Sequence, residues 1–119
     1  MKLQDIRWKR NIFNSIEDIS KIEWQKKVWL GKDLRYVSSY DEIIMVLFDD
    51  FCFDDFISND VFERLKLNKD LQKEMIQLKN MIDNYKRKVS EEEILNDPEW
   101  HKIVEQAQKI IQNDLQTVK

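Results

Sequence analysis

The chain has 119 residues, with 20 Lys and Arg against 23 Asp and Glu, a formal net charge of −3, and a single glycine, proline and cysteine. The length suits one domain with one hydrophobic core. So few Gly and Pro residues argue against sandwich and barrel folds, and the lack of Gly also excludes the loops that cradle phosphates. We therefore predict an all-α fold, a compact bundle of about five helices, with residues 1–119 as a single helical domain.

The predicted helices follow from apolar spacing. The clearest stripe runs from Leu71 to Val89 in steps of three and four residues, which is one face of a helix. Residues 40–51 are apolar nearly all round, so we expect that helix to be central and buried. Residues 52–60 lack a helical period and are expected to form an exposed loop or a single turn. In chain order, the helices are expected at residues 4–16, 21–30, 40–51, 68–88 and 98–116.

Helix-end signals support these boundaries. Ser-x-x-Glu sequences begin at Ser20, Ser39 and Ser90, and each predicts a capping box in which the hydroxyl accepts from a free backbone N–H. Gly31 follows the second helix, where a left-handed residue is expected. Asp97 precedes the only proline and is expected to cap the last helix.

The sequence also indicates a cellular location. A single cysteine cannot form an internal disulfide, which favours a reducing compartment. The first ten residues alternate charges instead of forming the apolar segment of a signal peptide. The longest apolar run, residues 43–48, falls far short of the roughly 20 residues that a membrane span requires. We expect a soluble cytoplasmic protein that makes no membrane contact.

Negative charge is concentrated in one stretch. Residues 1–35 carry nine basic and five acidic residues, residues 36–63 carry eight acidic and no basic residues, and residues 64–119 carry eleven basic and ten acidic residues, so the regional charges are +4, −8 and +1. The middle stretch also holds five of the six phenylalanines. Crowded carboxylates repel one another, and a basic partner anchored by exposed aromatic rings would offset that cost. The alternative interpretation is structural, with solvated acidic helix ends and phenylalanines in the core.

Few residues suggest catalysis or cofactor binding. His101 is the only histidine and is expected at the surface, Cys52 is expected to be a small apolar filler, and residues 86–88 form a basic cluster that suits a helix C-terminus. The aspartates within residues 49–55 lack the alternation and the glycine of a calcium loop. No predicted helix carries a basic stripe for nucleic acid. We expect no enzymatic activity, no cofactor, no metal and no direct contact with nucleic acid.

Three segments, in this order and at this spacing, resemble a family of small helical bacterial proteins. The segments are Val28-Trp29-Leu30-Gly31, then Tyr40-Asp41-Glu42 through Leu47-Phe48-Asp49-Asp50, and Asp97-Pro98-Glu99-Trp100 followed by Ile103, Val104 and Ala107. Proteins of this kind are similar to the immunity proteins of contact-dependent growth inhibition systems. That resemblance implies binding to the toxic C-terminal domain of a delivered effector, often a nuclease.

Together, the charge pattern and the resemblance predict an immunity protein that neutralises a cognate toxin, with a basic nuclease domain as the expected partner. Carboxylates would steer and pair with Lys or Arg of the toxin, while Phe53 and Phe56 would be exposed apolar anchors. The alternative is a non-enzymatic regulatory module whose 71–89 stripe forms a homodimer or pairs with a partner helix. The expected partner-binding residues are Asp49, Asp50, Phe53, Asp54, Asp55, Phe56 and Asp60.

Overall fold

A computed structural model describes residues 3–32, 35, 38–58 and 60–117, with side chains as far as residue 114. Every regular element within those ranges is a helix, so the predicted all-α class is confirmed, but the described chain contains eight α-helices and one π-helical turn instead of about five helices. The elements are α1 (Leu3–Ile19), α2 (Ile22–Trp29), α3 (Tyr40–Met45), the π-helix η1 (Val46–Asp50), α4 (Phe53–Ser58), α5 (Val61–Arg64), α6 (Lys69–Asn84), α7 (Glu91–Leu95) and α8 (Pro98–Thr117).

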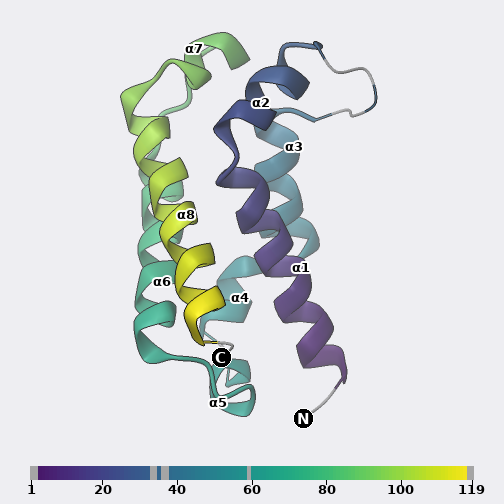
Figure 1. Ribbon diagram of the computed structural model, residues 1–119, viewed down its shortest axis with the longest axis vertical. Helices are drawn as coiled ribbons and strands as arrows, with labels where there is room; N and C mark the ends of the chain where they lie inside the picture. The colour runs from purple at the N-terminus through teal and green to yellow at the C-terminus, as the bar shows by residue number, and fades with distance from the viewer. Residues whose placement is uncertain (1–2, 33–34, 36–37, 59, 118–119) are drawn as a thin grey trace.

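The molecule is elongated, with extents of 41 × 28 × 27 Å. Figure 1 shows α1 and α3 on one side and α6 and α8 on the other, with α2 and α7 at one end and α4 and α5 towards the other. None of the helices in the described part of the chain is both long enough and apolar enough to cross a membrane.

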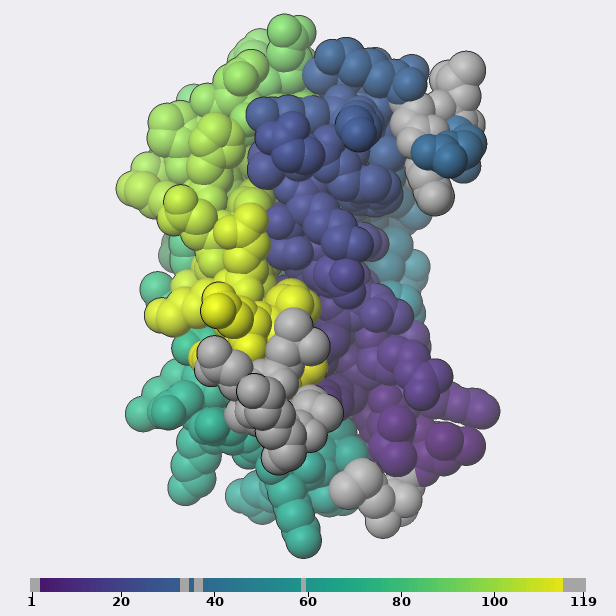
Figure 2. Space-filling view, in the orientation of Figure 1, coloured from purple at the N-terminus to yellow at the C-terminus, as the bar shows by residue number. Residues whose placement is uncertain are grey.

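Helix α8 packs against both α6 and α1. Figure 2 shows α8 (yellow) lying directly against α1 (blue to purple) on the near face. The side chains of Trp100, Ala107 and Ile110 on α8 are fully buried. The prediction of a central, buried helix at residues 40–51 is wrong. Only one face of α3 and η1 is buried, and Met45 is 45% exposed, because an apolar sequence does not fix how deeply a helix lies.

Most of the predicted helix ends are confirmed. The hydroxyls of Ser39 and Ser90 accept hydrogen bonds from the backbone N–H three residues later, at 3.1 and 3.2 Å. Asp97 Oδ1 accepts from the backbone N–H of Glu99 at 3.1 Å, and Gly31 is left-handed with φ +72°. The prediction that Ser20 caps the second helix is wrong. Its N–H still binds the α1 carbonyl of residue 16, and its hydroxyl donates back to the carbonyl of residue 17, so Ser20 ends α1 instead of starting α2.

The described part of residues 52–60 was expected to be an exposed loop or a single turn, but it contains the six-residue helix α4 with a buried face. Phe53, Phe56 and Ile57 are spaced three and one residues apart, and all three side chains are buried in the short helix α4. Helix α6 ends at Asn84 instead of residue 88, and Val89, the last residue of the predicted stripe, is 92% exposed beyond it. The stripe from Leu71 to Ile82 is buried within this chain, where α6 packs against α8.

A buried glutamine joins three helices at the α2 end. Gln25 is fully buried, and its Nε2 donates to the carbonyls of Asp18 and Ile19 at 2.9 and 2.8 Å, near the C-terminus of α1. Its Oε1 accepts from the indole Nε1–H of Trp100 on α8 at 3.0 Å. The side chain thus satisfies carbonyls that the end of α1 leaves free. We infer that it fixes α2 across the ends of α1 and α8.

Candidate partner-binding surface

The two phenylalanines that were expected to be aromatic anchors are core residues. Phe53 and Phe56 are both fully buried, so the expectation that they are exposed is wrong. The ring of Phe53 packs edge-on against Phe48 at 5.5 Å, and that of Phe56 packs against Trp8 at 5.2 Å and Phe62 at 5.3 Å. Together with Ile57 and Val61, these aromatic rings supply the core at this end of the molecule.

A π-helical turn positions the first carboxylates. The backbone N–H of Phe51 donates to the carbonyl of Val46, five residues earlier, at 3.0 Å. Asp49 and Asp50 lie at the end of this turn and are exposed. Cys52 then takes a left-handed conformation with φ 52°, which non-glycine residues rarely adopt. Its side chain is exposed, so the apolar-filler prediction is wrong: the change of direction between η1 and α4 turns it outward.

Two of the predicted carboxylates come together at a groove between α1 and the η1–α4 turn. The groove has a volume of about 450 Å³. Asp50 and Asp55 are exposed, and neither forms an ion pair with any residue that the structure describes. We call this feature the acidic groove; the residues that line it are Gln4, Arg7, Trp8, Asn11, Asp50, Phe51, Cys52 and Asp55.

The other predicted carboxylates do not join Asp50 and Asp55 in the groove. Asp54 lies on the α6 side, where its carboxylate is 3.8 Å from Lys79 Nζ. Asp60 precedes α5 and is near Arg64, which itself makes a two-bond contact to the buried Asp5 at 2.8 and 3.0 Å. Asp49 is exposed but does not line the groove. The single acidic face expected from the sequence is therefore divided.

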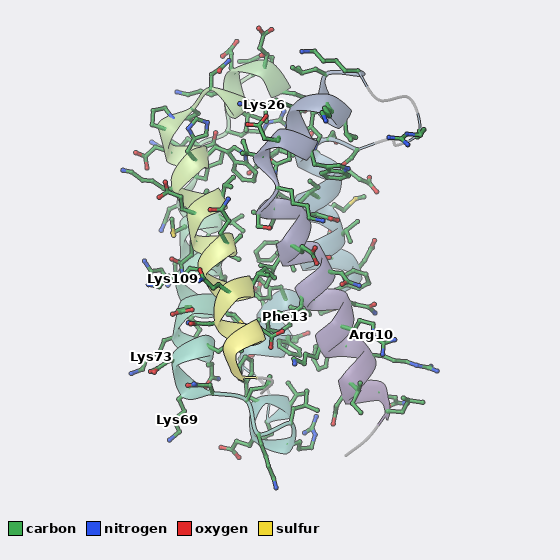
Figure 3. All side chains as sticks on the ribbon, viewed as in Figure 1. Arg10, Phe13, Lys26, Lys69, Lys73 and Lys109 are labelled. Carbon is green, nitrogen blue, oxygen red and sulfur yellow. The ribbon has the colours of Figure 1, made fainter. Side chains whose placement is uncertain are left out.

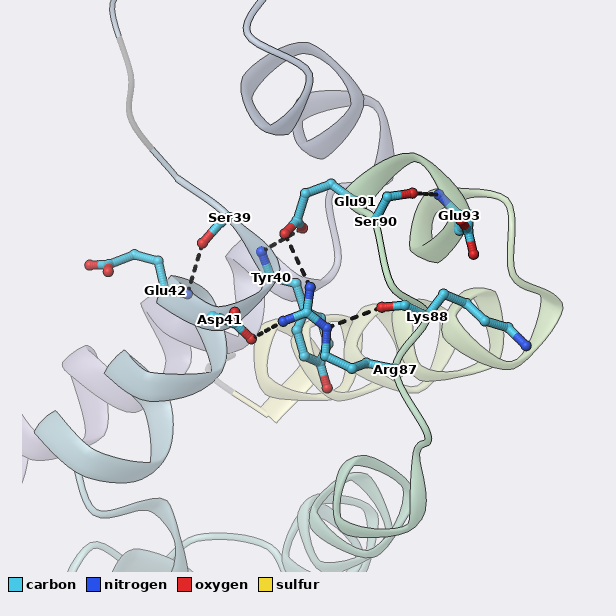
Figure 4. A network of polar contacts seen from close by, with 9 residues as sticks. All are labelled: Ser39, Tyr40, Asp41, Glu42, Arg87, Lys88, Ser90, Glu91 and Glu93. Carbon is cyan, nitrogen blue, oxygen red and sulfur yellow. Dashed lines mark hydrogen bonds and ion pairs between the residues drawn. The ribbon is translucent and has the colours of Figure 1, made fainter.

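Asp41 is held at the opposite end of the acidic stretch by Arg87, for which the sequence predicted only a role at a helix end (Figure 4). Arg87 donates to Asp41 on α3 and to Glu91 on α7, and its guanidinium lies 5.1 Å from the centre of the Tyr40 ring. Glu91 also accepts from the backbone N–H of Tyr40 at 2.9 Å. The hydrogen bond that Arg87 donates to Asp41 raises the pKa of Arg87, and burial raises the pKa of Tyr40. We call this set, Arg87 with Tyr40, Asp41 and Glu91, the Arg87 clasp.

Arg87 was expected to complement the C-terminus of a helix, and this interpretation is wrong because α6 ends before it. Several other basic side chains are turned to solvent. Figure 3 shows Arg10, Lys69 and Lys73 pointing away from the bundle, whereas Phe13 points between the helices. Asp41 and Arg87 are far apart in the sequence, and they meet only because the chain folds.

A second cavity, of about 480 Å³, lies between the end of α6 and the start of α8. Tyr85 Oη donates to Asp97 Oδ2 at 2.8 Å, and this hydrogen bond lowers the pKa of Asp97. Burial, followed by the same bond, raises the pKa of Tyr85. Asp97 also caps α8, so both of its oxygens are engaged within the chain. The polar pair in this cavity therefore satisfies itself, and the cavity is the weaker candidate for a binding site.

Among the described residues, no group of three or more His, Cys, Asp or Glu side chains is placed to hold a metal ion. His101 is exposed near the start of α8, with Nε2 2.6 Å from the carbonyl oxygen of Leu95. Comparison with protein-family models, with curated proteins and with solved structures gave no match to the chain.

Proposed function

We propose that the protein is an immunity protein that neutralises a toxin by binding a basic surface of it through the acidic groove. One observation carries the proposal. Asp50 and Asp55 are exposed at one groove and have no cationic partner within the described chain, whereas Asp41 and Asp54 lie next to Arg87 and Lys79. The resemblance of the three sequence segments to immunity proteins supplies the identity of the partner, a cognate toxin domain.

The proposed mechanism is occupancy. Unpaired carboxylates attract a cationic surface over distances of about 10 Å at moderate salt and raise the rate of encounter. Nuclease surfaces that hold a phosphate backbone are rich in Lys and Arg. An immunity protein seated on such a surface would exclude the nucleic acid. Phe51 and Trp8 supply partly exposed aromatic surface at the groove, in place of the buried Phe53 and Phe56.

The alternative of a module that dimerises through the 71–89 stripe loses its main support. Leu71, Met75, Leu78 and Ile82 of that stripe are buried within the chain, where α6 packs against α8. A homodimer through this face would require α8 to leave it. The apolar character of the stripe is explained by its packing in the core of this chain.

The test is the association rate with the toxin encoded beside this gene. Replacing Asp50 and Asp55 by Lys is expected to slow association by about tenfold or more at low salt, because steering and pairing are both reversed. The matched control is Glu92→Lys with Glu105→Lys, which makes the same change of net charge at exposed residues of α7 and α8. Equal rates for the two double variants would contradict the proposed surface.

A further inference from the structure

We infer that the acidic groove receives an arginine side chain of the protein partner, an inference that rests on the proposed function and specifies its central contact. The groove combines three features in one place. Trp8 and Phe51 provide aromatic surface, Asp50 and Asp55 provide negative charge, and Asn11 provides an amide. The groove is shallow and open to solvent, so a long side chain of a partner can reach it.

The aromatic side of the groove is held in place before any partner arrives. The indole Nε1–H of Trp8 donates to the carbonyl of Phe51 at 2.6 Å. The Trp8 ring also packs edge-on against the fully buried Phe56 at 5.2 Å. The hydrogen bond from Phe51 N–H to the Val46 carbonyl fixes the other wall. A preformed wall loses little conformational freedom on binding, which favours affinity.

The chemistry of the groove selects arginine over other side chains. A guanidinium is planar, stacks on aromatic rings and donates two parallel hydrogen bonds to a carboxylate. Lysine offers a compact, strongly hydrated charge that matches a flat aromatic wall less well. Asp50 and Asp55 repel an anion, so a phosphate or a carboxylate group is disfavoured at the same place.

Arg7 is the chain's own cation at this groove. It lies on α1, is exposed, and makes no ion pair with the residues that the structure describes. Arg7 therefore leaves the carboxylates uncovered, although its charge opposes the entry of a second cation. Replacing Arg7 by a neutral residue is therefore expected to strengthen the binding of an arginine side chain at the groove. Replacing a basic residue that forms ion pairs within the fold is not expected to do so.

The probe is N-acetyl-arginine amide, titrated into the ¹⁵N-labelled protein and followed by NMR. We expect binding with a dissociation constant on the order of 1 mM, which is typical for so small a ligand. The shifts should centre on the Trp8 indole N–H, the Asn11 side-chain amide and the backbone of Cys52. N-acetyl-citrulline amide, which has the same shape without the charge, is expected to bind at least about tenfold more weakly.

Variants locate the contact. Asp50→Asn with Asp55→Asn is expected to weaken arginine binding by about tenfold or more, and Arg7→Gln to strengthen it about twofold to threefold. Glu92→Gln with Glu105→Gln is the matched control and should change nothing. Equal binding of the citrulline probe, shifts centred elsewhere, or binding insensitive to the Asp50 and Asp55 changes would overturn the inference.

The two proposals fail separately. If the Asp50→Lys, Asp55→Lys variant loses the toxin but the arginine probe leaves the groove signals unmoved, the arginine inference fails and the proposed function stands. If the probe binds at the groove and no toxin associates with the protein, the groove chemistry stands and the proposed function fails.

Discussion

The acidic stretch has two ends, and they treat their carboxylates differently. Near its start, Asp41 is held by Arg87, which also reaches Glu91 and covers the Tyr40 ring. Further along, Asp50 and Asp55 line the acidic groove without an ion pair among the described residues. Both ends began as the same pattern, acidic residues with no basic neighbour in sequence. The folded structure alone shows which carboxylates connect helices and which are exposed to solvent without an ion pair.

The comparison shows why local charge density alone is weak evidence for a binding surface. Asp41 and Arg87 are 46 residues apart, and the ion pair between them cannot be read from either segment. A carboxylate that serves the fold contributes to stability, whereas one that serves a partner costs stability through repulsion or leaves it unchanged. The two ends can therefore be told apart by the free energy of unfolding of suitable variants.

The largest expected effect concerns the core beneath the groove. Phe56→Ala is expected to lower the free energy of unfolding by about 4 kcal/mol, because it leaves a cavity between Trp8 and Phe62. Met45→Ala, at a side chain that is 45% exposed in the same stretch, should cost less than about 1 kcal/mol. Urea denaturation measures both values. Similar losses for the two variants would mean that Phe56 is not a core residue.

How much of this could be predicted from the sequence depends on the range of the interaction. Caps act over two or three residues, so the sequence predicts those of Ser39, Ser90 and Asp97, and Gly31 marks its own left-handed position. Ser20 failed because the end of α1 and the start of α2 compete for it, and local spacing does not show which helix prevails.

The candidate site was predicted only in part. The sequence located the carboxylates, and Asp50 and Asp55 are indeed exposed at one groove. It did not reveal that Phe53 and Phe56 are core residues, since a phenylalanine in an acidic segment fits either role. The sequence also could not predict that Trp8 forms one wall of the groove. Trp8 lies 43 residues before the carbonyl that accepts its hydrogen bond.

A smaller effect is expected at the Arg87 clasp. Arg87→Met keeps most of the aliphatic stem but removes the contacts to Asp41 and Glu91 and the charge over Tyr40. We expect a loss of about 1–2 kcal/mol, because the contacts are partly exposed and each contributes modestly. Lys86→Met is the matched control, since Lys86 lies in the same connection and makes no ion pair within the described chain. Equal stability of the two variants would mean that the clasp holds nothing together.

The smallest expected effect is the most informative about function. Asp50→Asn with Asp55→Asn preserves shape and removes two charges that have no cationic partner in the described chain. The free energy of unfolding should stay within about 0.5 kcal/mol of the unmodified protein, or rise slightly as repulsion is relieved. Asp41→Asn, which breaks the pair with Arg87, should instead cost about 0.5–1 kcal/mol. If the groove variant lost as much stability as the Asp41 variant, the groove carboxylates would belong to the fold, and the argument that they are kept for a cationic partner would collapse.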